Sequence, residues 1–491
     1  MPKSETLFRY QQLAEDIKEK IQLGLFKTGE KLPSTRELHK KLNLSISTIY
    51  KAYIELEKEG LIEAVPKSGY FVRPSFETSK SDQFSPKDAP QSLEYQTIKT
   101  SAEKPHKVAV PSFVNQVLKA VNHPDYLHLG TAMLSPTFLP YQTIRKTLHD
   151  LTNQEMKSIL GYSLAQGEPE LRRQLSLRSL GIVDGIQAKD FVITNGCTEA
   201  ISLALKAVTN PGDVVAIESP TFYGFLPLLE ELQLLAIEIP TDPQTGIKLP
   251  ALDEAIQKYP IKACLLIPNF HNPLGSLMPL NHKKDIVELL DRYCVPIIED
   301  NINAELYYGK ERPIPIKAFD QNGSVIFCSS FSKSLAPGLR VGWMLPGDRY
   351  LNRILKLKAG YSVASSSLEQ HLFTQFMIHG NYERFLRSLR IQVKKQVDQF
   401  IKAIQRYFPD RIEVYKPEGG ILLWIKLPNE VEGMVVYQKA LENRISILPG
   451  TVFSTSGKFR NHIRIGCGFP FNAETEKGIA CLGGIIKRLV D

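Results

Sequence analysis

The first 60 residues carry short apolar stripes at helical spacing. The first stripe predicts a helix that stops near Gly24, and its positions are Tyr10, Leu13, Ile17 and Ile21. Ser34 and Glu37 have the spacing of a capping box and predict the start of a second helix, with Leu38 and Leu42 facing inward. A third helix, which Ser45 or Ser47 can cap, is predicted to end at Gly60, and its inward residues are Ile49, Ala52, Tyr53 and Leu56.

Two apolar runs follow, Leu61–Val65 and Tyr70–Arg73, and the Pro-Lys-Ser-Gly sequence between them predicts a β-hairpin. Three helices and a hairpin are the element order of a winged helix-turn-helix, whose third helix can enter the major groove of DNA. Here the polar face of that helix consists of Ser47, Thr48, Tyr50 and Lys51. Arg36 and Lys67 lie at a helix start and at the hairpin tip, where they can meet phosphates. The pattern equally fits a small helical module that binds another protein.

From residue 111 onward, apolar runs alternate with helical stretches, which predicts an α/β fold with a largely parallel sheet. The runs are FVIT, VVAIE, LLAIEIP, KACLLIP, VPIIED, SVIFCSS and VGWML. Between the two patterns, residues 76–110 are polar and have no sustained apolar period, as is typical of a linker. We therefore predict a head of residues 1–75, a linker of 76–110 and a body of 111–491.

Unusual polar residues follow the predicted strands of the body, at the edge where α/β sheets bind ligands. Asn195-Gly196 opens a helix whose free amides can approach an anion such as a phosphate. Asp300 ends an apolar run, where a carboxylate is costly unless it holds a partner such as a protonated ring nitrogen. The alternative is that it caps a helix after the strand. Lys333 lies among serines and is followed by Arg340, which suits a nucleophilic amine beside a phosphate clamp, although a surface lysine in a polar loop is the simpler alternative.

Composition narrows the class of protein. The 491 residues exceed one ordinary domain, and the absence of a long apolar run predicts a cytoplasmic protein without membrane spans. Six dispersed cysteines, mostly inside apolar runs, read as reduced, buried small residues and not as disulfides or zinc ligands. The net charge is +8, but residues 1–75 hold only 13 Lys and Arg against 10 Asp and Glu, so charge alone is a weak indication of nucleic-acid binding.

The run LPSTRELHKKLNLSISTIYKAYIELEKEGLIEAVPKSGYFV resembles the DNA-binding heads of GntR-type bacterial regulators over about residues 7–74. The resemblance implies a winged helix-turn-helix that binds double-stranded operator DNA. One position departs from it. Such heads often carry an arginine that contacts DNA where this chain has Ile46.

The body resembles fold-type I enzymes of the class I/II aminotransferase family, which use pyridoxal 5'-phosphate (PLP). The resemblance implies a large subdomain of about residues 160–345 and a small subdomain of about 346–491. It implies that Lys333 forms the internal aldimine, that Asp300 pairs with the pyridine nitrogen and that Asn272 in HNPLG binds the phenolic oxygen. Phe222, or Tyr223 in the alternative register, would stack on the ring. The residues implied around the phosphate are Cys197, Thr198, Ser330, Ser332 and Arg340.

Three further positions follow from the same resemblance. Tyr162 corresponds to a tyrosine that reaches the phosphate site of the neighbouring subunit, which implies a homodimer. Arg464 corresponds to the arginine that binds a substrate carboxylate. Asn303 stands where the family usually has a tyrosine, so cofactor binding is expected to survive better than fast turnover.

A GntR-type head joined to an aminotransferase-like body resembles the MocR-type transcription regulators. This implies a PLP-dependent DNA-binding regulator whose body senses PLP, or an amine or amino acid held as an external aldimine. The alternative is an active amino-acid aminotransferase with an accessory head, and a third reading is a PLP-binding scaffold with neither activity. The sequence leaves open the effector, the operator and whether the protein activates or represses.

Overall fold

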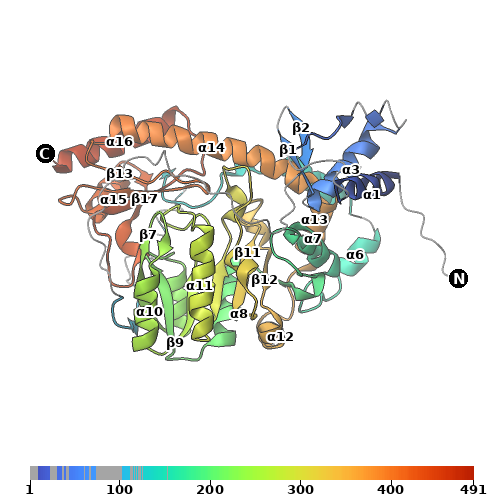
Figure 1. Ribbon diagram of the computed structural model, residues 1–491. Helices are drawn as coiled ribbons and strands as arrows, with labels where there is room; N and C mark the ends of the chain where they lie inside the picture. The colour runs from blue at the N-terminus through green and yellow to red at the C-terminus, as the bar shows by residue number, and fades with distance from the viewer. Residues whose placement is uncertain are drawn as a thin grey trace. The chain divides into compact units, whose positions relative to one another are not determined.

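The computed structural model describes residues 9–22, 30–35, 38–39, 44–59, 61–65, 68–72, 102–110, 114, 117, 119, 123, 125–151 and 153–490. Contacts divide the chain into two compact units, residues 1–95 with 173–188 and residues 96–172 with 189–491. We call the described residues between 9 and 72 the head, and the second unit the body. Each is described by itself (Figure 1).

The head has the predicted elements. Helices α1 (Arg9–Gln22) and α3 (Ile46–Lys58) pack together, and strands β1 (Ile62–Val65) and β2 (Gly69–Val72) form the antiparallel hairpin. All four inward residues predicted for the third helix are buried, and Ser45 is its N-cap. The second predicted helix is described only at Thr35, Leu38 and His39, because residues 36, 37 and 40–43 lie outside the described residues.

The main sheet of the body has nine described strands, with the order β3-β7-β6-β9-β10-β11-β12-β5 and β8 paired to β7. Their bounds are β3 (His106–Lys107), β5 (Val192–Thr194), β6 (Val214–Ser219), β7 (Leu235–Asp242), β8 (Gly246–Ile247), β9 (Ile261–Leu266), β10 (Ile297–Asp300), β11 (Val325–Ser330) and β12 (Gly342–Leu345). The central pairs from β7 to β11 are parallel, as predicted, whereas β12 runs antiparallel to both β11 and β5. Strand β3 falls within the predicted linker and pairs with β7.

Helices cover both faces of this sheet. Apolar residues of α8 (Cys197–Val208), α9 (Phe225–Glu231) and α12 (Asp348–Tyr361) form one core with it. On the other face the core comes from α10 (Leu249–Lys258) and α11 (Leu280–Arg292), which lie in front of the sheet in Figure 1. The carboxyl ends of the parallel strands therefore share one edge, which the sequence predicted as the ligand-binding edge.

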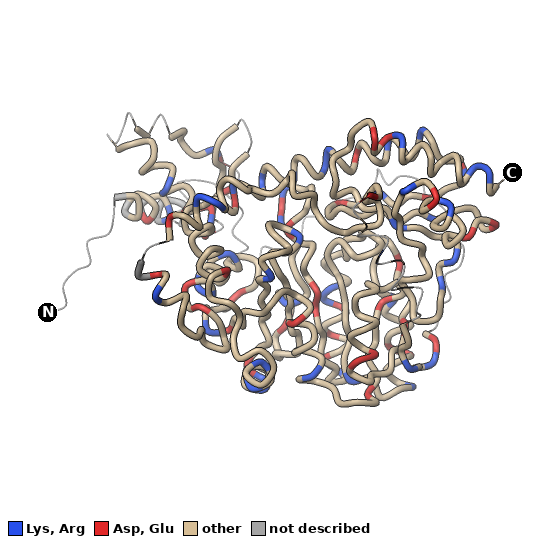
Figure 2. Tube along the Cα trace, turned by 180° about the vertical axis from the view of Figure 1, so that it is seen from behind, with Lys and Arg blue, Asp and Glu red and all other residues tan. Residues whose placement is uncertain are grey.

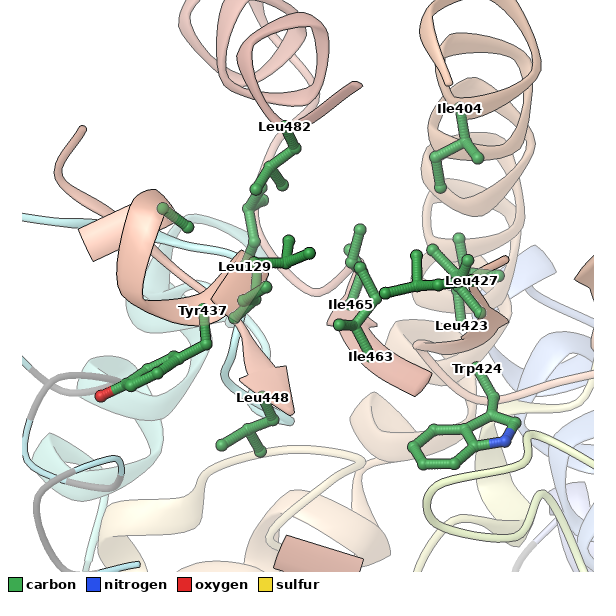
Figure 3. Close-up of a cluster of buried hydrophobic side chains, with 14 of the residues drawn as sticks. Leu129, Ile404, Leu423, Trp424, Leu427, Tyr437, Leu448, Ile463, Ile465 and Leu482 are labelled. Atoms are coloured by element: carbon green, nitrogen blue, oxygen red, sulfur yellow. The ribbon is translucent and has the colours of Figure 1, made fainter. Parts of the chain in front are cut away.

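A second sheet has the order β13-β14-β17-β16. Its strands are β13 (Glu413–Val414), β14 (Leu422–Lys426), β16 (Leu448–Pro449) and β17 (His462–Gly466), and its helices are α14 (Asn381–Tyr407), α15 (Gly433–Glu442) and α16 (Ala473–Val490). Figure 3 shows their buried side chains meeting, with Leu129 from the segment after β4 (Leu127–His128) among them. Strand β4 itself pairs with β15 (Ile445–Ser446). The remaining helices are α5 (Tyr141–His149), α6 (Asn153–Ile159), α7 (Pro169–Ser179) and α13 (Ser367–Ile378).

In Figure 2, Lys and Arg positions and Asp and Glu positions are scattered among one another along the trace of the body. The six cysteines are free thiols, and Cys294 is exposed, contrary to the expectation of burial. Within the described ranges, no helix is long and apolar enough to cross a membrane.

Candidate functional site

Lys333 lies in the turn that follows β11, at the carboxyl edge of the sheet. Its Nζ atom donates a hydrogen bond of 2.7 Å to the backbone carbonyl of Ala132. Burial lowers the pKa of Lys333 to about 8, and the positive charge of Arg464 acts in the same direction, while Asp300 opposes the shift. A substantial neutral fraction near pH 8 makes this amine a nucleophile, which a solvated surface lysine is not.

Asp300 is the last residue of β10 and is buried. Its Oδ1 atom accepts hydrogen bonds from the backbone N–H of Ile302 at 3.0 Å and from the thiol of Cys197 at 3.4 Å. Burial raises the pKa of Asp300 to about 6, and the hydrogen bonds and Lys333 limit that rise. At neutral pH the group is mainly a buried carboxylate, which favours a cationic or N–H partner.

The start of α8 is the corner at which the sequence predicts anion binding, and we call it the anion-binding corner. Gly196 is its N-cap with φ +84°, a left-handed conformation that favours glycine, and the Arg340 guanidinium lies close against it. Arg340 donates to the carbonyl of Asn195 at 3.1 Å and to the hydroxyl of Ser332 at 3.5 Å. Thr198 is exposed in the first helical turn. Free helix-start amides, hydroxyls and a guanidinium together suit a phosphate.

Ser330 and Cys197, also predicted around the phosphate, lie at this corner but are engaged with neighbours. The hydroxyl of Ser330 accepts from the backbone N–H of Ser332 at 3.2 Å. The thiol of Cys197 donates to Asp300, and burial raises its pKa well above the ordinary value. The neutral thiol therefore contacts the carboxylate and not the anion-binding corner.

Arg464 is completely buried in β17. Its guanidinium donates to the side-chain oxygen of Asn272 at 2.8 Å and to the carbonyl of Gly130 at 2.6 Å. It also lies 5.8 Å from the ring centroid of Tyr223 and 5.2 Å from that of Phe453. Burial lowers its pKa to about 10. Among the described residues its hydrogen-bond partners are neutral, no carboxylate pairs with it, and its Nε has no partner. A buried cation in this setting suits a carboxylate ligand.

The two aromatic residues proposed to stack on the cofactor ring differ in their surroundings. Phe222 contacts Tyr223 and Phe225 with ring centroids 4.8 and 5.3 Å apart, whereas Tyr223 also faces Arg464. Asn303 donates its amide to the carbonyl of Phe270 at 2.9 Å. The amide that replaces the usual tyrosine is thus already engaged with the backbone.

Tyr162 is 96% exposed and contacts none of the residues described above. The nearby Leu160 and Leu164 are also exposed, at 83% and 61%. Tyr162 therefore differs from Asp300, Cys197 and Arg464, which are buried.

In the head, Ser47 and Lys51 are exposed on α3, and Thr48 and Tyr50 are half-buried. Thr48 supplies the backbone N–H that the Ser45 hydroxyl caps at 3.1 Å. The Lys51 ammonium lies 5.9 Å from the ring centroid of Tyr10. Arg36 and Lys67 lie outside the described residues.

Sequence reasoning missed the backbone contacts of the site. The carbonyls of Gly130 and Ala132 hold Arg464 and Lys333, and no residue type signals such a contact. It also missed Glu199, which accepts from the backbone N–H of Asn195 and pairs with the buried Lys358 at 3.3 Å behind the anion-binding corner. An acidic residue in the first turn of a helix was the available signal.

Comparison with known proteins agrees with both units. Residues 132–474 match the aminotransferase class I and II family, and residues 9–72 match the gntR family of bacterial regulatory proteins. Two relatives from Escherichia coli (strain K12) are the uncharacterized HTH-type transcriptional regulators YjiR and YdcR. YjiR is 35% identical and covers 98% of this chain and 100% of its own, and YdcR is 34% identical and covers 98% and 99%.

Among solved structures, the body is similar to Pyrococcus horikoshii kynurenine aminotransferase in complex with PMP. The TM-score is 0.73 at 28% identity, over 78% of this chain and 95% of that one. The chain thus has a gntR-family segment before an aminotransferase segment, and the two regulators are similar to it over nearly its whole length. It belongs to the class I and II aminotransferase family and, within it, to the MocR-type proteins.

Proposed function

We propose that this protein is a PLP-dependent transcription regulator whose head binds operator DNA and whose body senses PLP, or an amine or amino acid bound with it. One observation carries the proposal. A lysine of lowered pKa, a buried carboxylate and a buried arginine come together in a chain that also has a winged helix-turn-helix head. The head would comprise residues 1–75, the linker 76–110 and the body 111–491. The body would have subdomains of about 160–345 and 346–491, and strand β3 at the end of the linker pairs with the body sheet.

The residues present fit PLP. Arg340, Ser332, Thr198 and the free amides of α8 would hold its phosphate, and Asp300 would keep a proton on its ring nitrogen. Asn272 would bind the phenolic oxygen, and Phe222 or Tyr223 would stack on the ring. When bound, PLP supplies a carbonyl group that captures amines and a ring that withdraws electrons from them. Lys333, whose amine is partly neutral near pH 8, is the group suited to bond with it.

Arg464 supports an amino acid as the effector. Its guanidinium is completely buried among Tyr223, Phe453 and two neutral acceptors, so a ligand carboxylate would provide the missing negative charge. An amine without a carboxylate would leave that charge uncompensated. We therefore propose an α-amino acid in preference to a simple amine.

The backbone of residues 129–135 is the proposed link between ligand and head. Its Gly130 and Ala132 carbonyls hold Arg464 and Lys333, the two groups that effector and cofactor would engage. A ligand must therefore compete with this segment for its hydrogen bonds. Because the segment follows the linker in the chain, we propose that its displacement changes the position of the linker. A coupling of about 1–3 kcal/mol is enough to change operator occupancy five-fold or more.

The proposed DNA contacts divide into two kinds. Ser47, Thr48, Tyr50 and Lys51 on α3 would face the major groove, whereas Arg36 and Lys67 would contact phosphates. Ser47 and Lys51 are exposed and therefore accessible to DNA, and Arg36 and Lys67 rest on the sequence alone.

We also propose a homodimer. Tyr162 is almost fully exposed between two exposed leucines, which supports the expectation that it reaches the phosphate site of a neighbouring subunit. Three large exposed apolar side chains within five residues, at positions 160, 162 and 164, are typical of a protein interface.

An amino-acid aminotransferase is the second candidate function, because the body also brings together the groups that transamination needs. The engagement of Asn303 with the Phe270 carbonyl instead favours cofactor binding over turnover. Measurable conversion of amino acids at about 1–10³ per second, without sequence-selective DNA binding, would support the enzyme.

The test is a binding titration of the full-length protein on the DNA upstream of its own gene and on random duplex at matched salt, with and without PLP and a panel of amino acids. We expect selective binding that weakens with salt and changes when PLP and one amino acid are both present. Replacement of Lys51 by alanine should weaken binding to both duplexes and reduce the salt dependence. Equal affinity for the two duplexes under all conditions would refute the regulator.

A further inference from the structure

Ile46 is an exposed apolar residue at the start of the proposed recognition helix. It is the first residue of α3 and is 48% exposed, whereas Ile49 and Tyr53 further along the helix are completely buried. Side chains in an α-helix lean toward its N-terminus, so Ile46 projects beyond the first turn. That is the end of a recognition helix whose residues contact base edges.

The polar groups beside Ile46 engage one another. The Ser45 hydroxyl accepts from the backbone N–H of Thr48 at 3.1 Å and lies 2.8 Å from the Ser47 hydroxyl and 2.7 Å from that of Thr48. The next cation, Lys51, lies more than one turn further along, near the Tyr10 ring. The branched alkyl side chain of Ile46 therefore protrudes beside a cluster of hydroxyls. It carries no charge that could bind a phosphate.

The major groove offers one apolar group on its base edges, the 5-methyl group of thymine. Resting on the proposed function, we infer that Ile46 determines operator specificity by contacting a thymine methyl. An arginine at this position, as in many GntR-type heads, would favour guanine through its N7 and O6 atoms. Isoleucine in place of arginine at position 46 thus changes which base of the operator is preferred and does not simply remove a contact.

The experiment uses the full-length protein and the duplex that it enriches from a random-sequence pool. Thymine is replaced by uracil, which lacks only the 5-methyl group, at one position of the duplex at a time. We expect one position in each half-site at which uracil weakens binding about fourfold, the value for one buried methyl-sized group. The Ile46→Ala protein should bind the thymine and uracil duplexes equally at that position.

The matched control is Ile391→Ala, which removes a 59% exposed isoleucine from α14 of the body and should leave the uracil effect unchanged. A second selection with Ile46→Arg should enrich guanine where the wild type enriches thymine. If no uracil weakens binding, or if Ile46→Ala retains the uracil effect, the inference is wrong while selective DNA binding still supports the regulator. If the pool yields no enriched duplex, the proposed function fails and the inference fails with it.

Discussion

The guanidinium of Arg464 donates a hydrogen bond of 2.8 Å to the side-chain oxygen of Asn272, a residue 192 positions earlier in the chain. Arg464 belongs to β17 of the second sheet, and Asn272 follows β9 of the main sheet. The bond therefore joins the group proposed to bind an effector carboxylate to the group proposed to bind the cofactor. Carboxylate binding at Arg464 would also alter the restraint on Asn272.

Replacing Arg464 by glutamine should weaken amino-acid binding about 10- to 100-fold, because a charge-assisted hydrogen bond contributes about 1.5–3 kcal/mol. Titration of the PLP-loaded protein, followed by its visible absorption, measures this affinity. An amine without a carboxylate should bind both proteins alike. The exposed Arg411, which pairs with Glu430, supplies the control Arg411→Gln. An equal loss for the simple amine would contradict the assigned role.

The rate of PLP attachment should depend on the protonation of Lys333. Only the neutral amine reacts, so the rate should rise with pH and level off above about 8 instead of 10.5. In Asp300→Asn the carboxylate that raises the lysine pKa is absent, so the midpoint should move to lower pH. Rapid-mixing absorbance measures both profiles. Lys333→Ala should show no borohydride-reducible absorption band, and persistence of that band would reject Lys333 as the attachment site.

The buried pair between Lys358 and Glu199 should stabilise the anion-binding corner. Lys358 is completely buried and also donates to the hydroxyls of Ser362 and Ser365. We expect Lys358→Met to lower the free energy of unfolding by about 3 kcal/mol, since it leaves a partly buried carboxylate without its cation. Urea unfolding measures this loss. The exposed neighbour Lys356 gives the control Lys356→Met, with a change within about 0.5 kcal/mol. Equal effects of the two substitutions would show that the pair contributes nothing.

Gly466→Ala should uncouple the effector from DNA binding. A Cβ atom at Gly466 would lie 1.8 Å from the carbonyl oxygen of Thr131, so residues 129–135 would have to move away from β17. We expect DNA affinity to become insensitive to the amino acid, while retained PLP absorption shows that the body is folded. A Cβ atom at Gly484 would meet only the end of the Arg488 side chain, at 3.7 Å, so in Gly484→Ala the response should persist. An unchanged response in Gly466→Ala would exclude this route of coupling.

Tyr162 should act in the partner subunit. Tyr162→Ala and Lys333→Ala should each bind PLP poorly when expressed alone. Co-expression should restore tight binding to part of the sites, because a mixed dimer combines an intact Lys333 in one subunit with an intact Tyr162 from the other. PLP retention after gel filtration, compared with that of each variant alone, measures the recovery. Failure to recover would place Tyr162 outside the neighbouring site.

Much of the fold follows from local patterns in the sequence. Each of the seven continuous apolar runs in the body forms a strand, because strands buried on both faces must be apolar throughout. The inward stripe of α3 was correct in full because an amphipathic helix buries one face. The antiparallel direction of β12 was not predictable, since an apolar run has the same composition in either direction.

The sequence by itself determined which side chains stand at the sheet edge, because Asp300 ends one buried strand and Lys333 lies three residues after another. Only the tertiary structure decided what those side chains contact. Ala132 lies 201 positions from Lys333, and Gly130 lies 334 positions from Arg464. Both supply backbone carbonyls, which every residue has, so composition and spacing carry no trace of them. Burial, which sets the pKa values of Lys333 and Asp300, likewise arises only when distant segments close around them.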